Sequence, residues 1–305
     1  MISTFNLKLS KIGNRRILRD FESHKMIEIM INSGKPFLVS RFGSTESQVL
    51  IENLGAEIHL ESMEKLWKLS GVFPNSIDIA KKYAKAATDA ALEIDVCGTR
   101  CSKFEHAFWN NERVTVSEFA PRAVLIDIEV LAPIDVKESW VRALENKKVL
   151  VIHPFAETIQ RQYLRREKLF QDPNWLPEFR LLTMQSIQSL SGTPHSTGHP
   201  DWFSALDSMR IEIQKRDFDI ALIGAGAYGM NLGAYIKGIG KQAIHVGGAL
   251  QLFFGIKGFR WTNKEEPTFL EITKNPNWVW PSEKEVPSNF FEVERGAYWN
   301  PTHLD

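Results

Sequence analysis

The sequence has few cysteines and lacks any long apolar run. Two cysteines among 305 residues are too few for a disulfide scaffold or a four-thiolate metal site. No stretch approaches the roughly 18 uninterrupted apolar residues that predict a transmembrane helix. Residues 1–20 contain no continuous apolar segment of the kind found in secretory signal peptides. We therefore expect a cytoplasmic protein, a location that the scarcity of cysteine also fits.

The sequence also lacks a net charge. Lys and Arg total 37, and so do Asp and Glu. Because nucleic-acid binding relies on a broad positive field, we expect no nucleic-acid partner. A local excess of basic residues at 8–19 is typical of a solvated helix face. The same excess would also suit peripheral attraction to the anionic inner face of a membrane.

Short apolar runs alternate with helical patterns along the chain. Strands are predicted at 35–42, 95–98, 123–130, 147–153, 179–184, 218–223 and 242–246. Helices are predicted from Ser44 onward and at 76–92, 155–170, 202–215 and 228–237. Several strands are apolar without a period of two, which indicates burial on both faces. The sequence therefore predicts an open, mostly parallel, Rossmann-like α/β sheet with helices on both faces.

Three parts of the chain are predicted. Residues 1–34 form an N-terminal helical segment, residues 35–262 form the Rossmann-like α/β domain, and residues 263–305 form an aromatic-rich tail packed on that domain. Aromatic rings can stack on sugar rings, although packing against a domain is their commoner use. The tail offers Trp278, Trp280, Tyr298 and Trp299.

One predicted strand ends in a glycine-rich turn. Residues 224–229 read GAGAYG, which matches G-x-G-x-x-G between a predicted strand and a predicted helix. Ligands of open α/β sheets bind at such strand ends, where glycines allow a phosphate to approach and a helix N-terminus offers free N–H groups. The turn is either a tight structural feature or a phosphate or nucleotide-sugar site. The binding residues would be Gly224, Gly226, Tyr228 and Gly229.

A nicotinamide cofactor is not expected. A ribose-binding carboxylate should follow the glycine-rich turn by about 20 residues, but residues 243–248 read AIHVGG. The end of that strand instead places His245 and Gly247 at the same edge of the sheet. We therefore count both among the residues that would bind a nucleotide sugar.

The first predicted strand of the domain ends in the sequence RFGSTE, residues 41–46. Ser44 is a natural N-cap, and Glu46 falls in the first helical turn, where the helix dipole favours a carboxylate. These local roles are one interpretation of the motif. In the other, Glu46 holds a divalent cation or acts as a base, and Arg41 binds a phosphate in bidentate fashion. Gly43 and Ser44 would then contact the same ligand.

His153 ends the predicted strand at 147–153. It is either a hydrogen-bonded structural residue or a catalytic base that activates an acceptor hydroxyl.

The strand, RFG-x-x-E and helix together resemble the signature of the GT-D-fold glycosyltransferases. Members carry RFGDGE or RYGDGE, whose D-x-E motif is associated with the metal and the nucleotide-sugar diphosphate. Residues 221–248, ALIGAGAYGMNLGAYIKGIGKQAIHVGG, are similar to the later part of that family. They also resemble uncharacterised proteins of bacterial capsule and lipopolysaccharide clusters.

The resemblance implies a glycosyltransferase of cell-surface polysaccharide biosynthesis. Its partners would be a nucleotide-sugar donor and a glycan or lipid-linked glycan acceptor, with assembly into a homo-oligomer left open. The family's Asp is replaced by Ser44, and a hydroxyl is a poor ligand for a hard cation. A Mn²⁺ or Mg²⁺ cofactor would therefore depend on Glu46 as its carboxylate. The alternative is a non-catalytic nucleotide-sugar- or glycan-binding protein of the same pathway.

Overall fold

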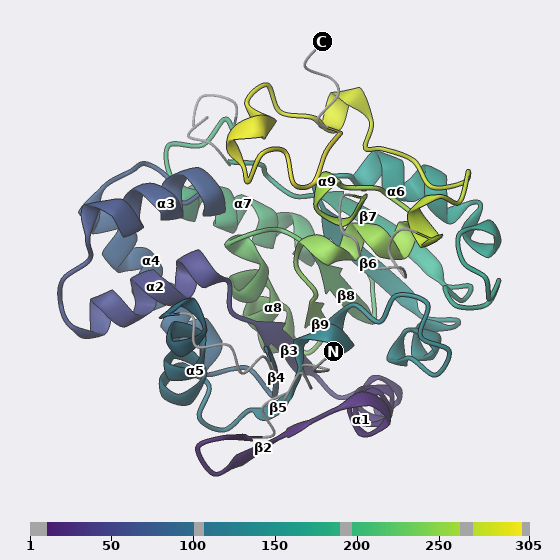
Figure 1. Cartoon of the computed structure of the whole chain (residues 1–305), viewed down its shortest axis with the longest axis horizontal. Coiled ribbons are helices and arrows are strands. Elements are labelled where there is room, and N and C mark those ends of the chain that lie inside the picture. Colours follow the sequence, from purple (N-terminus) through teal and green to yellow (C-terminus); the bar gives the residue numbers. More distant parts are fainter. Residues whose placement is uncertain (1–10, 101–106, 190–196, 263–270, 301–305) are drawn as a thin grey trace, which may run out of the picture.

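The computed structural model of the chain describes residues 11–100, 107–189, 197–262 and 271–300. These residues form a nine-stranded sheet in the order β1-β2-β5-β4-β3-β9-β8-β6-β7 (Figure 1). All neighbouring strands are parallel except β1 and β2, which form a hairpin. The strands are Lys11–Ile12 (β1), Arg15–Leu18 (β2), Phe37–Arg41 (β3), Val96–Thr99 (β4), Val124–Asp127 (β5), Lys148–His153 (β6), Arg180–Gln185 (β7), Ile220–Ile223 (β8) and Gln242–His245 (β9).

The side chains of the central strands alternate between two hydrophobic cores. In β6, Leu150 and Ile152 pack into one core, whereas Val149 and Val151 pack into the other. None of the four has any exposed surface. Both directions are apolar because helices cover both faces of the sheet. The predicted fold class, a mostly parallel α/β sheet, is confirmed, and the strands predicted at 35–42, 147–153, 218–223 and 242–246 all lie in it.

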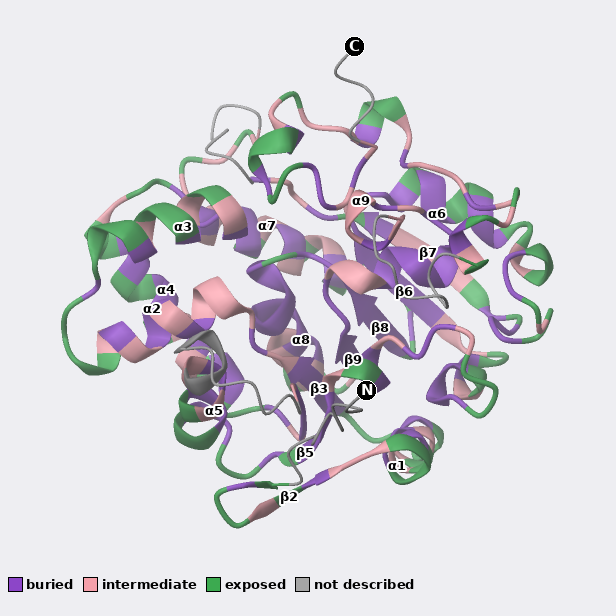
Figure 2. Cartoon of the chain, viewed as in Figure 1, coloured by how far each residue is buried: buried purple, intermediate pink, exposed green. Residues whose placement is uncertain are grey.

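Helices lie on both faces of the sheet, and Figure 2 shows the buried strands between them. One face carries Ser44–Leu54 (α2), Leu60–Ser70 (α3), Ile77–Ala91 (α4), Ala107–Phe119 (α5), Trp202–Gln214 (α7) and Tyr228–Gly238 (α8). The other face carries Asp20–Asn32 (α1), Ala156–Tyr163 (α6), Phe259–Thr262 (α9) and the described part of the tail. The helix predicted at 155–170 is therefore shorter than expected.

The predicted N-terminal helical segment contains a helix, but it also contributes to the sheet. In β2, Ile17 and Leu18 pair with residues of β5. The Arg15 guanidinium donates hydrogen bonds to the carbonyl oxygens of Val116 (3.0 Å) and Ala120 (2.6 Å). Arg15 thus bonds to carbonyls at the C-terminus of α5, rather than lying on a solvated helix face. Residues 1–10 of the predicted segment lie outside the described residues.

The tail is helical at 271–273 and mostly irregular from there to residue 300, with short 3-10 turns at Glu283–Glu285 and Phe290–Glu292. Trp278 and Trp299 are buried, and their indole N–H groups donate to the carbonyl oxygens of Leu169 (2.7 Å) and Glu285 (3.1 Å). These two rings pack in the core, whereas Tyr298 is half-buried. The boundaries proposed for the three parts of the chain stay a prediction.

Within the described ranges, no helix combines the length and the apolar character needed to cross a bilayer.

Candidate functional site

The carboxyl ends of β3, β9, β8 and β6 lie at one edge of the sheet, where open α/β sheets bind their ligands. After β3 the chain enters α2, whose Val49 and Leu50 pack in one core. After β9 it enters a 3-10 segment, Gly248–Phe254, whose apolar side chains pack in the opposite core. The segments that follow the neighbouring strands β3 and β9 therefore lie on opposite faces of the sheet. This arrangement is typical of a ligand-binding position.

Arg41 ends β3 with an unpaired guanidinium. Its Nη2 donates to the carbonyl oxygen of Phe42 (3.0 Å), while its Nε is buried without a hydrogen-bond partner in the described structure. No described carboxylate forms an ion pair with it. Burial lowers the pKa of Arg41 and the charge of Arg100 lowers it further, whereas Glu46 and Glu112 raise it. Because an arginine keeps its charge in proteins, Arg41 is a cation without an ion-paired carboxylate among the described residues.

Gly247 brings Arg41 close to the backbone of β9. A Cβ on Gly247 would lie 3.0 Å from the Arg41 Nη1, and the φ of this glycine is +81°. On the other side, the Gly247 carbonyl oxygen lies 2.8 Å from where a Cβ of Gly224 would be. Gly247 therefore lies between Arg41 and the glycine-rich turn, with no side chain to separate them.

The turn after β8 presents unused backbone donors. The N–H groups of Ala225, Gly226 and Ala227 reach no acceptor among the described residues, and α8 begins directly after them, at Tyr228. Gly226 has a φ of +51°, and a Cβ there would meet only the Ser70 carbonyl oxygen, at 3.8 Å. Consecutive free N–H groups at a helix N-terminus form an anion-binding arrangement.

The other two predicted residues of this turn have structural contacts. A Cβ on Gly229 would overlap the His245 ring, so this glycine makes room for the histidine. The Tyr228 ring is buried and stacks on Trp202 at 4.9 Å, and its hydroxyl lies 3.0 Å from the Ser189 Oγ. Burial raises the pKa of Tyr228. Contact of Tyr228 or Gly229 with a ligand stays a prediction.

His245 and His153 are both buried and neutral. Burial lowers the pKa of each to about 3, and the charge of Arg41 contributes at His245. His245 shares a hydrogen bond with the Ser40 Oγ (3.0 Å), which ties β9 to β3. The His153 Nδ1 accepts from the Phe155 N–H (3.0 Å), which assigns the ring proton to Nε2. In this arrangement His153 can donate a hydrogen bond from Nε2, and its role as a catalytic base stays a prediction.

Glu46 lies in the first turn of α2, as predicted. The predicted N-cap at Ser44 is wrong: Gly43 occupies the N-cap position and no side chain caps the helix. A Cβ on Gly43 would overlap the Glu46 carboxylate, so the carboxylate lies back over the start of the helix. It accepts no hydrogen bond from the described residues and lies within electrostatic reach of Arg41. Glu46 is therefore available to a ligand.

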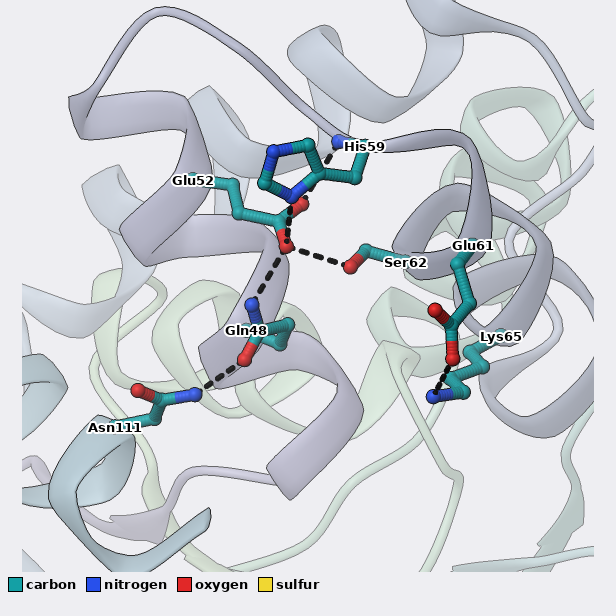
Figure 3. A network of polar contacts seen from close by, with 7 residues as sticks. All are labelled: Gln48, Glu52, His59, Glu61, Ser62, Lys65 and Asn111. Atoms are coloured by element: carbon teal, nitrogen blue, oxygen red, sulfur yellow. Dashed lines mark hydrogen bonds and ion pairs between the residues drawn. The ribbon is translucent and has the colours of Figure 1, made fainter. Parts of the chain in front are cut away.

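At its other end, α2 is fixed by a buried carboxylate, that of Glu52 (Figure 3). Glu52 accepts hydrogen bonds from Gln48 Nε2 (2.6 Å), Ser62 Oγ (2.7 Å), and both the backbone N–H and Nδ1 of His59 (2.9 Å each). Gln48 in turn accepts from Asn111 of α5. The network joins α2 to α3 and α5, and so sets the position of the helix that carries Glu46.

Sequence reasoning missed a second arginine at this edge. Arg100 follows β4 and pairs with Glu112, a buried residue of α5. Glu112 also accepts from the Thr99 hydroxyl (3.1 Å) and the Arg100 backbone N–H (2.9 Å). Thr99 and Arg100 directly follow the strand predicted at 95–98. Their place at a strand end was the signal that could have identified them as candidate site residues. The α5 helix that supplies Glu112 was not predicted.

The described residues contain no cluster of three or more His, Cys, Asp or Glu side chains that could hold a metal ion. Glu46 fits a divalent cation only as one ligand beside the oxygens of a bound diphosphate, a pattern common for Mg²⁺.

No protein-family model matches the chain, and no curated protein matches its sequence. Solved structures do show a similar arrangement. One is described as a domain of unknown function 1792 with a distinct glycosyltransferase fold; it is 17% identical, with 77% of this chain and 79% of that chain covered and a TM-score of 0.44. A selenomethionine form of that domain is 16% identical (78% and 80% covered, TM-score 0.45). A protein from Streptococcus sanguinis, described as a new glycosyltransferase of the same domain family, is 11% identical (88% and 96% covered, TM-score 0.45).

Proposed function

We propose that this protein is a glycosyltransferase that binds the diphosphate of a nucleotide sugar at the carboxyl edge of its sheet. One observation carries the proposal: the unpaired Arg41 and the free N–H groups of residues 225–227 lie on either side of Gly247. Because neighbouring strands are about 4.8 Å apart, the ends of β3 and β8 are about 10 Å apart. A diphosphate can contact both groups across that span.

Glycosyl transfer breaks the bond between the anomeric carbon and the diphosphate oxygen and forms a bond to the acceptor oxygen. Arg41 and the start of α8 stabilise the negative charge of the leaving diphosphate. Glu46 takes the proton of the acceptor hydroxyl. If Mn²⁺ or Mg²⁺ were bound, Glu46 would hold it through one carboxylate oxygen, and the cation would stabilise the charge of the diphosphate. His153 contributes its Nε2–H as a donor.

The acceptor is a glycan or a lipid-linked glycan of cell-surface polysaccharide assembly. This part of the proposal is supported by the resemblance of residues 41–46 and 221–248 to that class of protein.

A second candidate is a non-catalytic nucleotide-sugar-binding protein of the same pathway. Ser44 favours it, because the hydroxyl stands where a carboxylate would help to hold a cation. Binding without transfer is what this alternative predicts.

Ligand-induced stabilisation tests the binding step, because a ligand that binds the native state raises the melting temperature. UDP-, GDP-, CMP- and dTDP-sugars are added with and without Mn²⁺ to the wild type, Arg41→Gln and Arg16→Gln. Arg16 is a matched control, since its exposed guanidinium in β2 pairs with Glu22 of α1 (2.7 Å). We expect one donor class to stabilise the wild type and Arg16→Gln but not Arg41→Gln. Absence of stabilisation by every donor would refute the proposal.

A further inference from the structure

The tail carries Tyr298 to the end of β9 and fixes it there. Its neighbours are tied to α9, because Phe259 and Arg260 donate backbone N–H groups to the carbonyl oxygens of Trp299 (3.2 Å) and Ala297 (2.9 Å). The Trp299 ring is buried and bonded to Glu285. The Tyr298 side chain is therefore held in place by the segments on either side of it.

The Tyr298 ring lies over Gly248, the residue next to Gly247. A Cβ on Gly248 would overlap the ring and would lie 3.1 Å from the phenolic oxygen. Two consecutive glycines thus make room for two side chains from distant parts of the chain, Arg41 at Gly247 and Tyr298 at Gly248. The side chains are also within electrostatic reach of each other.

The Tyr298 hydroxyl has a donor but no described acceptor. Arg260 Nη1 donates to its oxygen at 3.2 Å, and the Arg260 guanidinium lies 5.0 Å from the ring centroid. Among the described residues nothing accepts the phenolic hydrogen, and the residue is only half-buried. Because the oxygen already accepts from a cation, its own O–H bond is polarised and is a stronger donor.

We infer that the Tyr298 hydroxyl donates a hydrogen bond to a phosphate oxygen of the diphosphate that Arg41 binds. The inference rests on the proposed function, since it requires an anion beside Arg41. The tail would then contribute directly to the donor-binding site. It would reach the carboxyl edge of the sheet from the face opposite α2.

Pyrophosphate is the probe, because it presents the diphosphate without base or sugar. Its dissociation constant is measured by calorimetry for the wild type, Tyr298→Phe and Tyr235→Phe. Phenylalanine keeps the ring on Gly248 and removes only the hydroxyl. Tyr235 is a matched control in the second half of α8, where its ring lies near Arg210 (5.4 Å).

We expect Tyr298→Phe to bind pyrophosphate about tenfold more weakly, the loss typical of one hydrogen bond to a charged group. Tyr235→Phe should bind like the wild type. In the wild type, pyrophosphate should also shift the near-ultraviolet absorbance of tyrosine, and Tyr298→Phe should lack that shift. Equal affinity of Tyr298→Phe and wild type would overturn the inference while leaving the proposed function intact. If the wild type bound neither pyrophosphate nor any nucleoside diphosphate, both would fall.

Discussion

Replacing Glu52 with glutamine should destabilise the protein by about 2 kcal/mol at pH 6. The Glu52 side chain is only 6% exposed, and its two oxygens accept four hydrogen bonds. Glutamine keeps the volume but has one acceptor oxygen, so at least one donor must face its NH₂ group. Leaving a buried donor without a partner costs about 1–3 kcal/mol, and the remaining bonds lose their charge assistance.

The free energy of unfolding is measured in urea for the wild type, Glu52→Gln and Glu61→Ala. Glu61 is the matched control shown in Figure 3: it pairs with Lys65 at 2.6 Å, but both side chains are more than half exposed. Exposed pairs of this kind contribute little to stability. We therefore expect Glu61→Ala to unfold like the wild type, with the same dependence of free energy on urea concentration.

The pH dependence gives the prediction a second, independent signature. Burial alone would raise the pKa of Glu52, but hydrogen bonds from Ser62, Gln48 and His59 together hold it below its ordinary value of 4.5. Its contribution is present above pH 4.5 and is lost as the pH falls through the lowered pKa. The hydrogen bond to Glu52, and then the Glu52 charge, raise the pKa of His59 above 6.5. That contribution is present below pH 6.5 and is lost as the pH rises through the raised pKa.

The difference between wild type and Glu52→Gln should thus be largest between about pH 4.5 and 6.5. A variant as stable as the wild type throughout that range would refute the reasoning, and so would an equal loss in Glu61→Ala.

The remaining predictions concern the candidate site. Gly226→Val places a β-branched residue at a φ of +51°, which should lower stability by about 1–2 kcal/mol and remove donor-induced thermal stabilisation. Gly240→Val is its control, because Gly240 has a φ of +82° in open space at the far end of α8. The Gly240→Val variant should lose stability but keep donor binding. Equal loss of donor binding in both variants would indicate that residues 224–229 are only a structural turn. Glu46→Gln should change stability by about 0.3–1 kcal/mol and lower transfer by orders of magnitude in an assay of nucleoside-diphosphate release, whereas full activity would remove Glu46 from the site. Ser44→Asp should raise the Mn²⁺ dependence of that release, and a profile identical to the wild type would argue against a cation at Glu46.

The positions of most core strands and of several helices could be predicted because their signals are local. The apolar residues at 149–152 and 243–244 are fully buried, and a short apolar run of this kind is a local signal of a strand covered on both faces. Ser76 caps α4 through its side chain, accepting from the Ile79 N–H at 3.3 Å. Local rules failed where several groups competed, as at the start of α2, where the backbone of Gly43 occupies the cap position and Glu46 lies over it.

The candidate site was only partly predictable. Strand ends in a parallel sheet share one edge, so the sequence alone brought Arg41, Glu46 and the glycine-rich turn together. It did not distinguish glycines that adopt a positive φ from glycines that leave room for a neighbouring side chain. Gly226 needs its positive φ, whereas Gly229 makes room for the His245 ring.

Sequence by itself determined the central strands of the sheet and placed the candidate site residues at the ends of those strands. Only the tertiary structure decided which distant side chains come into contact. Arg15 bonds to a carbonyl 105 residues away, Glu112 pairs with Arg100, and Tyr298 meets Gly248 from the tail. A charged or aromatic residue has the same local pattern whether it is solvated or packed. Its partner is fixed only when burial of the sheet brings separate segments of the chain into contact.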